Sequence, residues 1–206
     1  VRLARGEDVY VTCDPELVSE VLGPPPHEKG VVERAPAVVV AAVLSWTPAG
    51  GDLMFIESMR MTGKGVVHLT GQMGDVMKES AAAAFTYLRA RARSYGLDPD
   101  FLAKTDVHVH LPQGAVPKDG PSAGIAILVS LASMLTGQKV LSEYAMTGEI
   151  TLRGNVLRVG GIKDKCLAAH RAGVKHVILP KANEPDLEEV PREIREALHV
   201  HMVSRV

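Results

Sequence analysis

One serine of this 206-residue chain is placed where its hydroxyl could act as a nucleophile. Ser122 follows a loop rich in glycine and proline, Pro112–Gly120, and precedes a strongly apolar run. Pro121 suits the first position of a helix, so we expect a helix from Pro121 to about Leu135 with Ser122 in its first turn. The unpaired N–H groups of that turn and the helix dipole would favour an oxyanion beside the hydroxyl. Because Pro121 has no N–H, the predicted oxyanion donors are the backbone N–H groups of Gly120 and Ser122.

Two other roles are open for this serine. Serines are common at helix starts, where the hydroxyl only caps the backbone. Glycine-rich loops before helices also bind phosphate groups. The stretch Lys118–Ser122 lacks the Gly-Lys-Ser/Thr ending of a Walker loop, so it is not a P-loop. Asp119 could orient the reacting groups or cap the helix that follows it.

A neutral lysine could activate such a hydroxyl. The residues between Gly160 and Gly173 predict a helix over 162–172, with Lys165 at the edge of its apolar face and Lys163 nearer the solvated side. Among small apolar side chains an amine is desolvated, which lowers its pKa and leaves it free to accept a proton. The alternative is that the stem of Lys165 covers the apolar face while its ammonium reaches water.

Other polar residues have simpler explanations. His108 and His110 alternate along one predicted strand, and His199 and His201 along another, so each pair shares a face. Solvent exposure explains these pairs better than a metal site, since no third ligand with suitable spacing is visible. Thr147 lies in a turn-like stretch, where hydroxyls commonly bond to the backbone. A Ser–His–Asp triad has no specific support.

Predicted strands and helices alternate along the chain and position these residues. Their order shows no internal repeat and predicts an α+β fold with a mixed sheet. Strands are predicted at 37–46, 52–61, 66–70, 107–111, 144–152, 156–159, 174–179 and 199–203. Helices are predicted at 74–95, 121–135, 162–172 and 192–198. A hairpin turn is predicted at Arg153–Asn155.

The first thirty residues differ from the rest. A short helix is predicted to start at Thr12–Glu16 and to stop at Gly23–Pro26. We therefore expect residues 1–30 to be the tail and linker of a preceding domain, and 31–206 to be one domain. Because the chain opens without methionine and stops in mid-pattern, we expect it to be part of a longer protein.

Composition excludes several functions. A formal net charge of −1 gives no reason to expect nucleic acid or an anionic membrane as a partner, and a content of only 4% aromatic residues argues against a base-stacking platform. The longest apolar runs, 37–44 and 125–135, are too short to span a bilayer. Cys13 and Cys166 form neither a disulfide framework nor a metal-ligand pattern, which favours a reducing compartment.

Three stretches together resemble the signature motifs of the Lon-type ATP-dependent proteases. They are Pro117–Gly124, Ala145–Gly154 and Gly160–Lys165, and the likeness extends to Gly71–Ser80 and His170–Gly173. It covers essentially residues 31–206 and implies the Lon protease domain fold. That fold has mixed sheets with packed helices and resembles the ribosomal protein S5 domain 2-like superfold. One departure is the first strand, which lacks the usual glycine-containing approach to the tryptophan.

The resemblance also implies roles for particular residues. Ser122 and Lys165 match the family's Ser–Lys dyad, which hydrolyses peptide bonds through an acyl-enzyme. Thr147 matches a threonine expected to bond near the dyad and to hold the lysine. Asp119 matches an aspartate implicated in switching the nucleophile loop between inactive and active forms. Trp46 matches a tryptophan close to the substrate groove.

Members of this family are ring-shaped hexamers whose ATPase domains unfold proteins and feed them into a closed chamber. The resemblance thus implies unfolded or damaged proteins as substrates and a homo-hexamer in the full-length protein, with no nucleic acid or membrane required. ATP and Mg would serve an ATPase domain outside this chain, which has no Walker A motif, and the domain itself is expected to need no cofactor or metal. Bacterial cytoplasm is the expected location, with the mitochondrial matrix and the peroxisome as alternatives.

Two other functions share the expected superfold. A small-molecule kinase would need carboxylates for magnesium, and none clusters convincingly in the sequence. A non-catalytic assembly module would leave Ser122 and Lys165 unrelated in space.

Overall fold

A mixed seven-stranded sheet forms the centre of the computed structural model, which describes residues 12–23, 40–47, 50–112 and 117–206. The order of its strands is β3-β4-β2-β1-β5-β8-β9. Their bounds are β1 Val40–Thr47, β2 Gly50–Thr62, β3 Val67–Thr70, β4 Thr105–His110, β5 Tyr144–Met146, β8 His176–Pro180 and β9 His199–Val203. The β1–β2 and β2–β4 pairs are antiparallel and the other neighbours run parallel. β6 (Glu149–Ile150) and β7 (Val156–Leu157) form a separate two-stranded ribbon.

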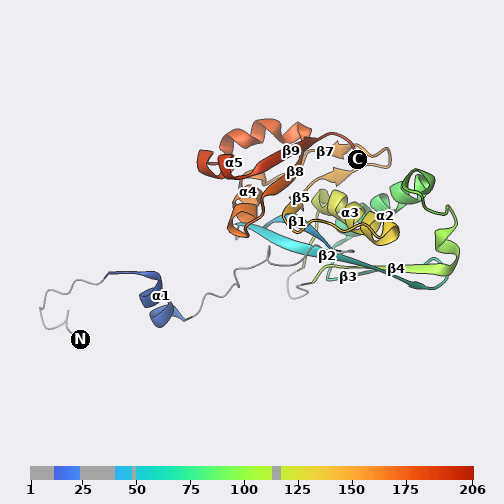
Figure 1. The fold of residues 1–206 in the computed structure, drawn as a ribbon, viewed down its shortest axis with the longest axis horizontal. Coiled ribbons are helices and arrows are strands. Elements are labelled where there is room, and N and C mark those ends of the chain that lie inside the picture. Colours follow the sequence, from blue (N-terminus) through green and yellow to red (C-terminus); the bar gives the residue numbers. More distant parts are fainter. Residues whose placement is uncertain (1–11, 24–39, 48–49, 113–116) are drawn as a thin grey trace, which may run out of the picture.

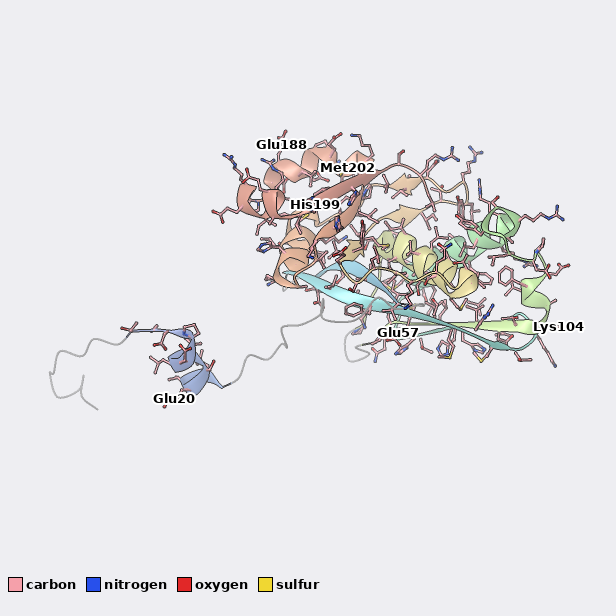
Figure 2. The ribbon with its side chains drawn as sticks, in the orientation of Figure 1. Glu20, Glu57, Lys104, Glu188, His199 and Met202 are labelled. Atoms are coloured by element: carbon pink, nitrogen blue, oxygen red, sulfur yellow. The ribbon has the colours of Figure 1, made fainter. Side chains whose placement is uncertain are left out.

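Helices cover both faces of this sheet (Figure 1). Along β1, Val43 joins a core cluster with α2 (Asp75–Ala90) and α3 (Gly124–Thr136), whereas Ala42 and Leu44 join a second cluster with α4 (Ile162–Arg171) and α5 (Arg192–Ala197). Because successive side chains of a strand point to opposite faces, the two helix pairs lie on opposite sides of β1. Side chains fill the space between helices and sheet (Figure 2). The predicted α+β fold with a mixed sheet is confirmed.

The longest predicted helix has a different end in the structure. The helix expected over 74–95 is α-helical only to Ala90, and a 3₁₀ helix, Ala92–Tyr95, follows it. The predicted stop at Gly96 is confirmed, since this glycine has the left-handed conformation, with φ 69°. The 3₁₀ helices Phe101–Lys104 and Lys181–Glu189 had no prediction, because such short turns leave no apolar periodicity to read.

The strand expected over 144–152 is in fact two strands, β5 and β6, and the interruption matters for the site. The Thr147 N–H still bonds to the carbonyl of Ile178 in β8 at 3.1 Å. After it, the Gly148 N–H turns to the carbonyl of Ser122 at 2.8 Å, and the Gly148 carbonyl accepts from the N–H of Ile125 at 3.1 Å. The chain therefore leaves the sheet at Thr147 in order to contact the start of α3.

The short N-terminal helix is confirmed as α1, Pro15–Leu22. Asp14 caps it, with its carboxylate accepting from the N–H of Leu17 at 2.8 Å, and none of its residues is buried. The predicted domain boundary near Gly30 and the first residues of the predicted strand 37–46 lie outside the described residues. Within the described ranges, every helix is too short or too polar to cross a membrane.

Candidate active site

Lys165 is buried on the inner side of α4. Only 2% of it is exposed, whereas Lys163, two residues earlier, is exposed, as the helical-face argument predicts. Its Nζ donates a hydrogen bond of 2.9 Å to the hydroxyl of Thr147. Burial lowers the pKa of the Lys165 amine from 10.5 to about 8, because an ammonium loses hydration there. The ammonium therefore does not reach water, and the amine can be neutral near physiological pH.

Thr147 links this amine to the turn that holds Ser122. Its hydroxyl accepts from Lys165 and donates to the carbonyl oxygen of Ser122 at 3.2 Å. The same carbonyl accepts from the Gly148 N–H, so two donors fix its position. Thr147 is fully buried, and a hydroxyl with both roles satisfied is favourable in such a place. The bridge fixes the backbone of Ser122 relative to the lysine.

Ser122 lies in a 3₁₀ turn, Pro121–Ala123, that leads directly into α3. The predicted helix start at Pro121 is thus correct, although its first turn is tighter than an α-helix. Ser80 of α2 holds this turn through a bond of 3.2 Å to the Pro121 carbonyl. Ser122 is half-buried, and its hydroxyl makes no hydrogen bond to any other described residue, so it is available to rotate between staggered positions.

Asp119 caps a helix, but not the one that follows it in the sequence. Its Oδ1 accepts from the N–H of Met77, in the first turn of α2, at 3.0 Å, and not from the helix that follows it. The same oxygen accepts from the Gly120 N–H at 2.8 Å. One of the two predicted oxyanion donors is therefore occupied by a carboxylate in this arrangement. Gly120 has φ 120° and ψ 157°, a conformation that is essentially limited to glycine.

Trp46 lies at the end of β1 and is 55% exposed. Its indole N–H donates to the carboxylate of Asp164 at 3.0 Å, so the ring lies against the first turn of α4. A cavity of about 560 Å³ opens beside this turn, bounded by residues 158–164, Asp186 and Glu189. Its wall includes Asp164 but neither Ser122 nor Lys165, so the cavity borders the site without containing it.

Two other reactive side chains of the described residues are buried. Cys166 is buried beside the lysine, and burial raises the pKa of its thiol to about 11, which keeps it protonated and inert. Lys118, the other buried lysine of the described residues, is 8% exposed. Burial lowers the pKa of Lys118, while the charge of Asp52 acts in the opposite direction.

The predicted histidine pairs have local partners. His108 and His110 both contact the hydroxyl of Thr70, at 2.8 and 2.7 Å. His201 contacts the ring of His176, which was not singled out, at 3.0 Å, next to the exposed His199 of β9. Within the part of the chain that the structure describes, no three His, Cys, Asp or Glu side chains are grouped so as to hold a metal ion.

Residues 12–206 match the model of the Lon protease (S16) C-terminal proteolytic domain. The chain belongs to the Lon proteolytic-domain family. It is 51% identical to the Lon protease of Desulfosudis oleivorans over 205 residues, 53% identical to Lon protease 2 of Myxococcus xanthus over 206, and 53% identical to the peroxisomal Lon protease homolog 2 of Rattus norvegicus over 201. These alignments cover 100%, 100% and 95% of the chain, but only 25%, 25% and 24% of the relatives. The chain thus spans about a quarter of the length of these relatives.

In this Lon domain, three distant motifs meet at one place. Pro117–Gly124 contributes Ser122, Ala145–Gly154 contributes Thr147, and Gly160–Lys165 contributes the lysine. Ser80 and Asp164 were not predicted as parts of the site. Asp164 stands next to Lys165 in its motif, but nothing in the sequence pointed to a partner 118 residues away.

Proposed function

We propose that this Lon domain hydrolyses peptide bonds through Ser122, with the neutral amine of Lys165 as general base. The observation that carries the proposal is the position of that amine, which is buried and held on Thr147, itself bonded to the carbonyl of Ser122. A rotation about one side-chain bond of Ser122 is all that the hydroxyl needs to change its direction. Catalytic hydrogen bonds are often incomplete before substrate binds, so the present geometry is compatible with this role.

The reaction proceeds in two halves. The amine of Lys165 accepts the proton of the Ser122 hydroxyl as its oxygen attacks the peptide carbonyl, and a tetrahedral oxyanion forms. The resulting ammonium returns the proton to the leaving amine, which gives an acyl-enzyme. The neutral amine then activates a water molecule that releases the acyl group. The Ser122 N–H is one donor to the oxyanion, and the Gly120 N–H becomes a second once Asp119 releases it.

Because the pKa of Lys165 is lowered, its amine can act as a base near neutral pH. With a pKa of about 8, about a quarter of the Lys165 side chains are neutral at pH 7.5, whereas an ordinary lysine is about 0.1% neutral. Catalytic bases work best when their pKa lies near the operating pH. Lys163 is exposed and has no comparable environment.

The proposal also covers the full-length protein. The three relatives are named as Lon proteases, and one of them as peroxisomal. We propose that an ATPase module outside this chain uses ATP and Mg to deliver unfolded or damaged proteins to the site, in a homo-hexameric ring. Bacterial cytoplasm is the proposed location, and the mitochondrial matrix and the peroxisome are the alternatives.

Hydrolysis of a fluorogenic peptide, and of casein without ATP, tests the proposal. The parent chain is compared with the Ser122→Ala, Lys165→Ala, Lys163→Ala and Lys118→Ala variants. Loss of either dyad member should lower the rate by at least about a thousandfold. Lys163→Ala should match the parent, and a chelator should have no effect. Wild-type activity in Lys165→Ala would refute the assigned base, and a loss confined to Lys118→Ala would assign that role to Lys118.

A further inference from the structure

The first turn of α4 is hydrogen-bonded to the end of β1. The indole N–H of Trp46, at the end of β1, donates to the carboxylate of Asp164 at 3.0 Å. An ionised acceptor makes this bond stronger than one between neutral groups. Asp164 and Lys165 are neighbours on α4, yet they face different partners, since one is held by Trp46 and the other by Thr147.

Close backbone packing supports the same junction. A side-chain carbon added to Gly161 would lie 2.8 Å from the Trp46 side chain, so the ring packs directly on the start of the helix. A carbon added to Gly51, the second residue of β2, would lie 2.0 Å from the carbonyl oxygen of Asp164. At the other end of α4, Arg171 donates to the Gly51 carbonyl at 2.8 Å. The hairpin and the helix therefore meet with no space between them.

We propose that Asp164 is a positioning residue, which through its hydrogen bond to Trp46 fixes the first turn of α4 and so keeps the Lys165 amine on Thr147. This inference rests on the proposed role of Lys165 as base. A lysine carries its amine on four rotatable bonds, so the position of that amine depends on where the helix holds the backbone. A misplacement of about 1 Å in a catalytic group can reduce the rate by about a hundredfold.

Trp46 is also the exposed partner of this pair, so the bond lies at the surface of the site. It joins the strand that borders the site to the helix that carries the base. A substitution of Trp46 would therefore alter the position of Lys165 by moving α4, although the two side chains share no hydrogen bond in the described structure.

Four variants test the inference by peptide hydrolysis. Trp46→Phe keeps a ring against Gly161 but removes the donor, and Asp164→Ala removes the acceptor. Each should lower kcat/KM by about tenfold, and the double variant should be no slower than the slower single one, because both changes break the same bond. Asp164→Asn keeps an acceptor oxygen and should restore most of the rate lost in Asp164→Ala.

The pH profile separates positioning from simple structural support. Trp46→Phe leaves every ionisable group in place, so a looser α4 should shift the midpoint of kcat/KM to higher pH as the amine becomes better hydrated. If Trp46→Phe and Asp164→Ala lower only the Tm and keep the parent rate and midpoint, the inference is wrong while the dyad stands. Lys165→Ala is measured in the same series, and parent-like activity there would overturn both the dyad and the inference.

Discussion

The Lys165 amine donates a hydrogen bond of 2.9 Å to the hydroxyl of Thr147. That hydroxyl donates in turn to the carbonyl oxygen of Ser122 at 3.2 Å. Thr147 stands where the chain leaves the sheet between β5 and β6, so the interruption of the sheet places its hydroxyl between the Lys165 amine and the backbone of Ser122.

Replacing Thr147 by valine tests this link. Valine keeps the shape of the side chain but removes the hydroxyl, so both the amine and the Ser122 carbonyl lose a partner. We expect kcat/KM to fall by about 10- to 100-fold. The midpoint of the pH profile should move to lower pH, because the lost bond favoured the charged amine. Thr147→Ser should recover most of the activity, and a valine variant as active as the parent would show that the bridge is dispensable.

The pH dependence of the parent enzyme follows from the pKa of Lys165, about 8. Below that value the amine is mostly protonated, so kcat/KM should rise about tenfold per pH unit and level off above about pH 8. The measurement is peptide hydrolysis at low substrate concentration across pH 6 to 10. Lys163→Ala should show the same midpoint. A midpoint near 6.5 would instead indicate a histidine as the base.

Lys165 should lower the stability of the fold while it supports catalysis. Its pKa is about 8 in the folded chain and about 10.4 in the unfolded chain, so the unfolded state binds more protons between these values. Stability should therefore rise with pH through that window, and below pH 8 the buried charge costs about 3 kcal/mol.

Lys165→Met removes this charge but keeps the length of the side chain. At pH 7 the variant should be inactive and more stable than the parent, and the gain should mostly disappear by pH 10. Urea unfolding at the two pH values measures this difference, with Lys163→Met on the exposed side of α4 as the matched control. An equal gain at both pH values would mean that better packing, not charge, causes it.

The backbone at Gly120 gives a test of the nucleophile loop. A side-chain carbon there would meet no atom within 4 Å, but the φ of 120° is strained for any other residue. Gly120→Ala should therefore rotate the loop and reduce kcat by about 10- to 100-fold. Gly96→Ala is the matched control, since it also has open space and a positive φ, of 69°, but ends a helix outside the site. It should lose stability and keep its activity. Equal kcat losses in the two variants would contradict the role of the loop.

The sequence predicted those features that depend on local pattern. Helical spacing alone placed Lys165 at the edge of the apolar face of its helix and Lys163 nearer the solvated side, because apolar residues recur there with the period of a helix. It left open whether the Lys165 amine reaches water. Pro121 marked the start of the turn that holds Ser122. The proximity of Thr147 to the lysine was expected only from the resemblance to Lon proteases. From spacing alone this threonine looked like an ordinary turn residue.

The features that could not be predicted depend on contacts between distant parts of the chain. Asp119 caps α2, 42 residues before it, instead of the helix beside it. The bond between Trp46 and Asp164 spans 118 residues. Neither contact leaves a periodic pattern in the sequence, because both arise from the way the sheet brings separate elements together. The same reason explains the division of the strand predicted over 144–152, since Gly148 turns toward Ser122.

The most direct test of the account is covalent trapping of the nucleophile. The chain is treated with a fluorophosphonate between pH 6 and 9, and the adduct is followed by intact mass and located by peptide mapping. We predict one adduct, on Ser122, that forms faster as pH rises through about 8, is absent in Ser122→Ala and forms at least about a hundredfold more slowly in Lys165→Ala. An adduct on another residue, or labelling of Ser122 at the parent rate in Lys165→Ala, would contradict the account.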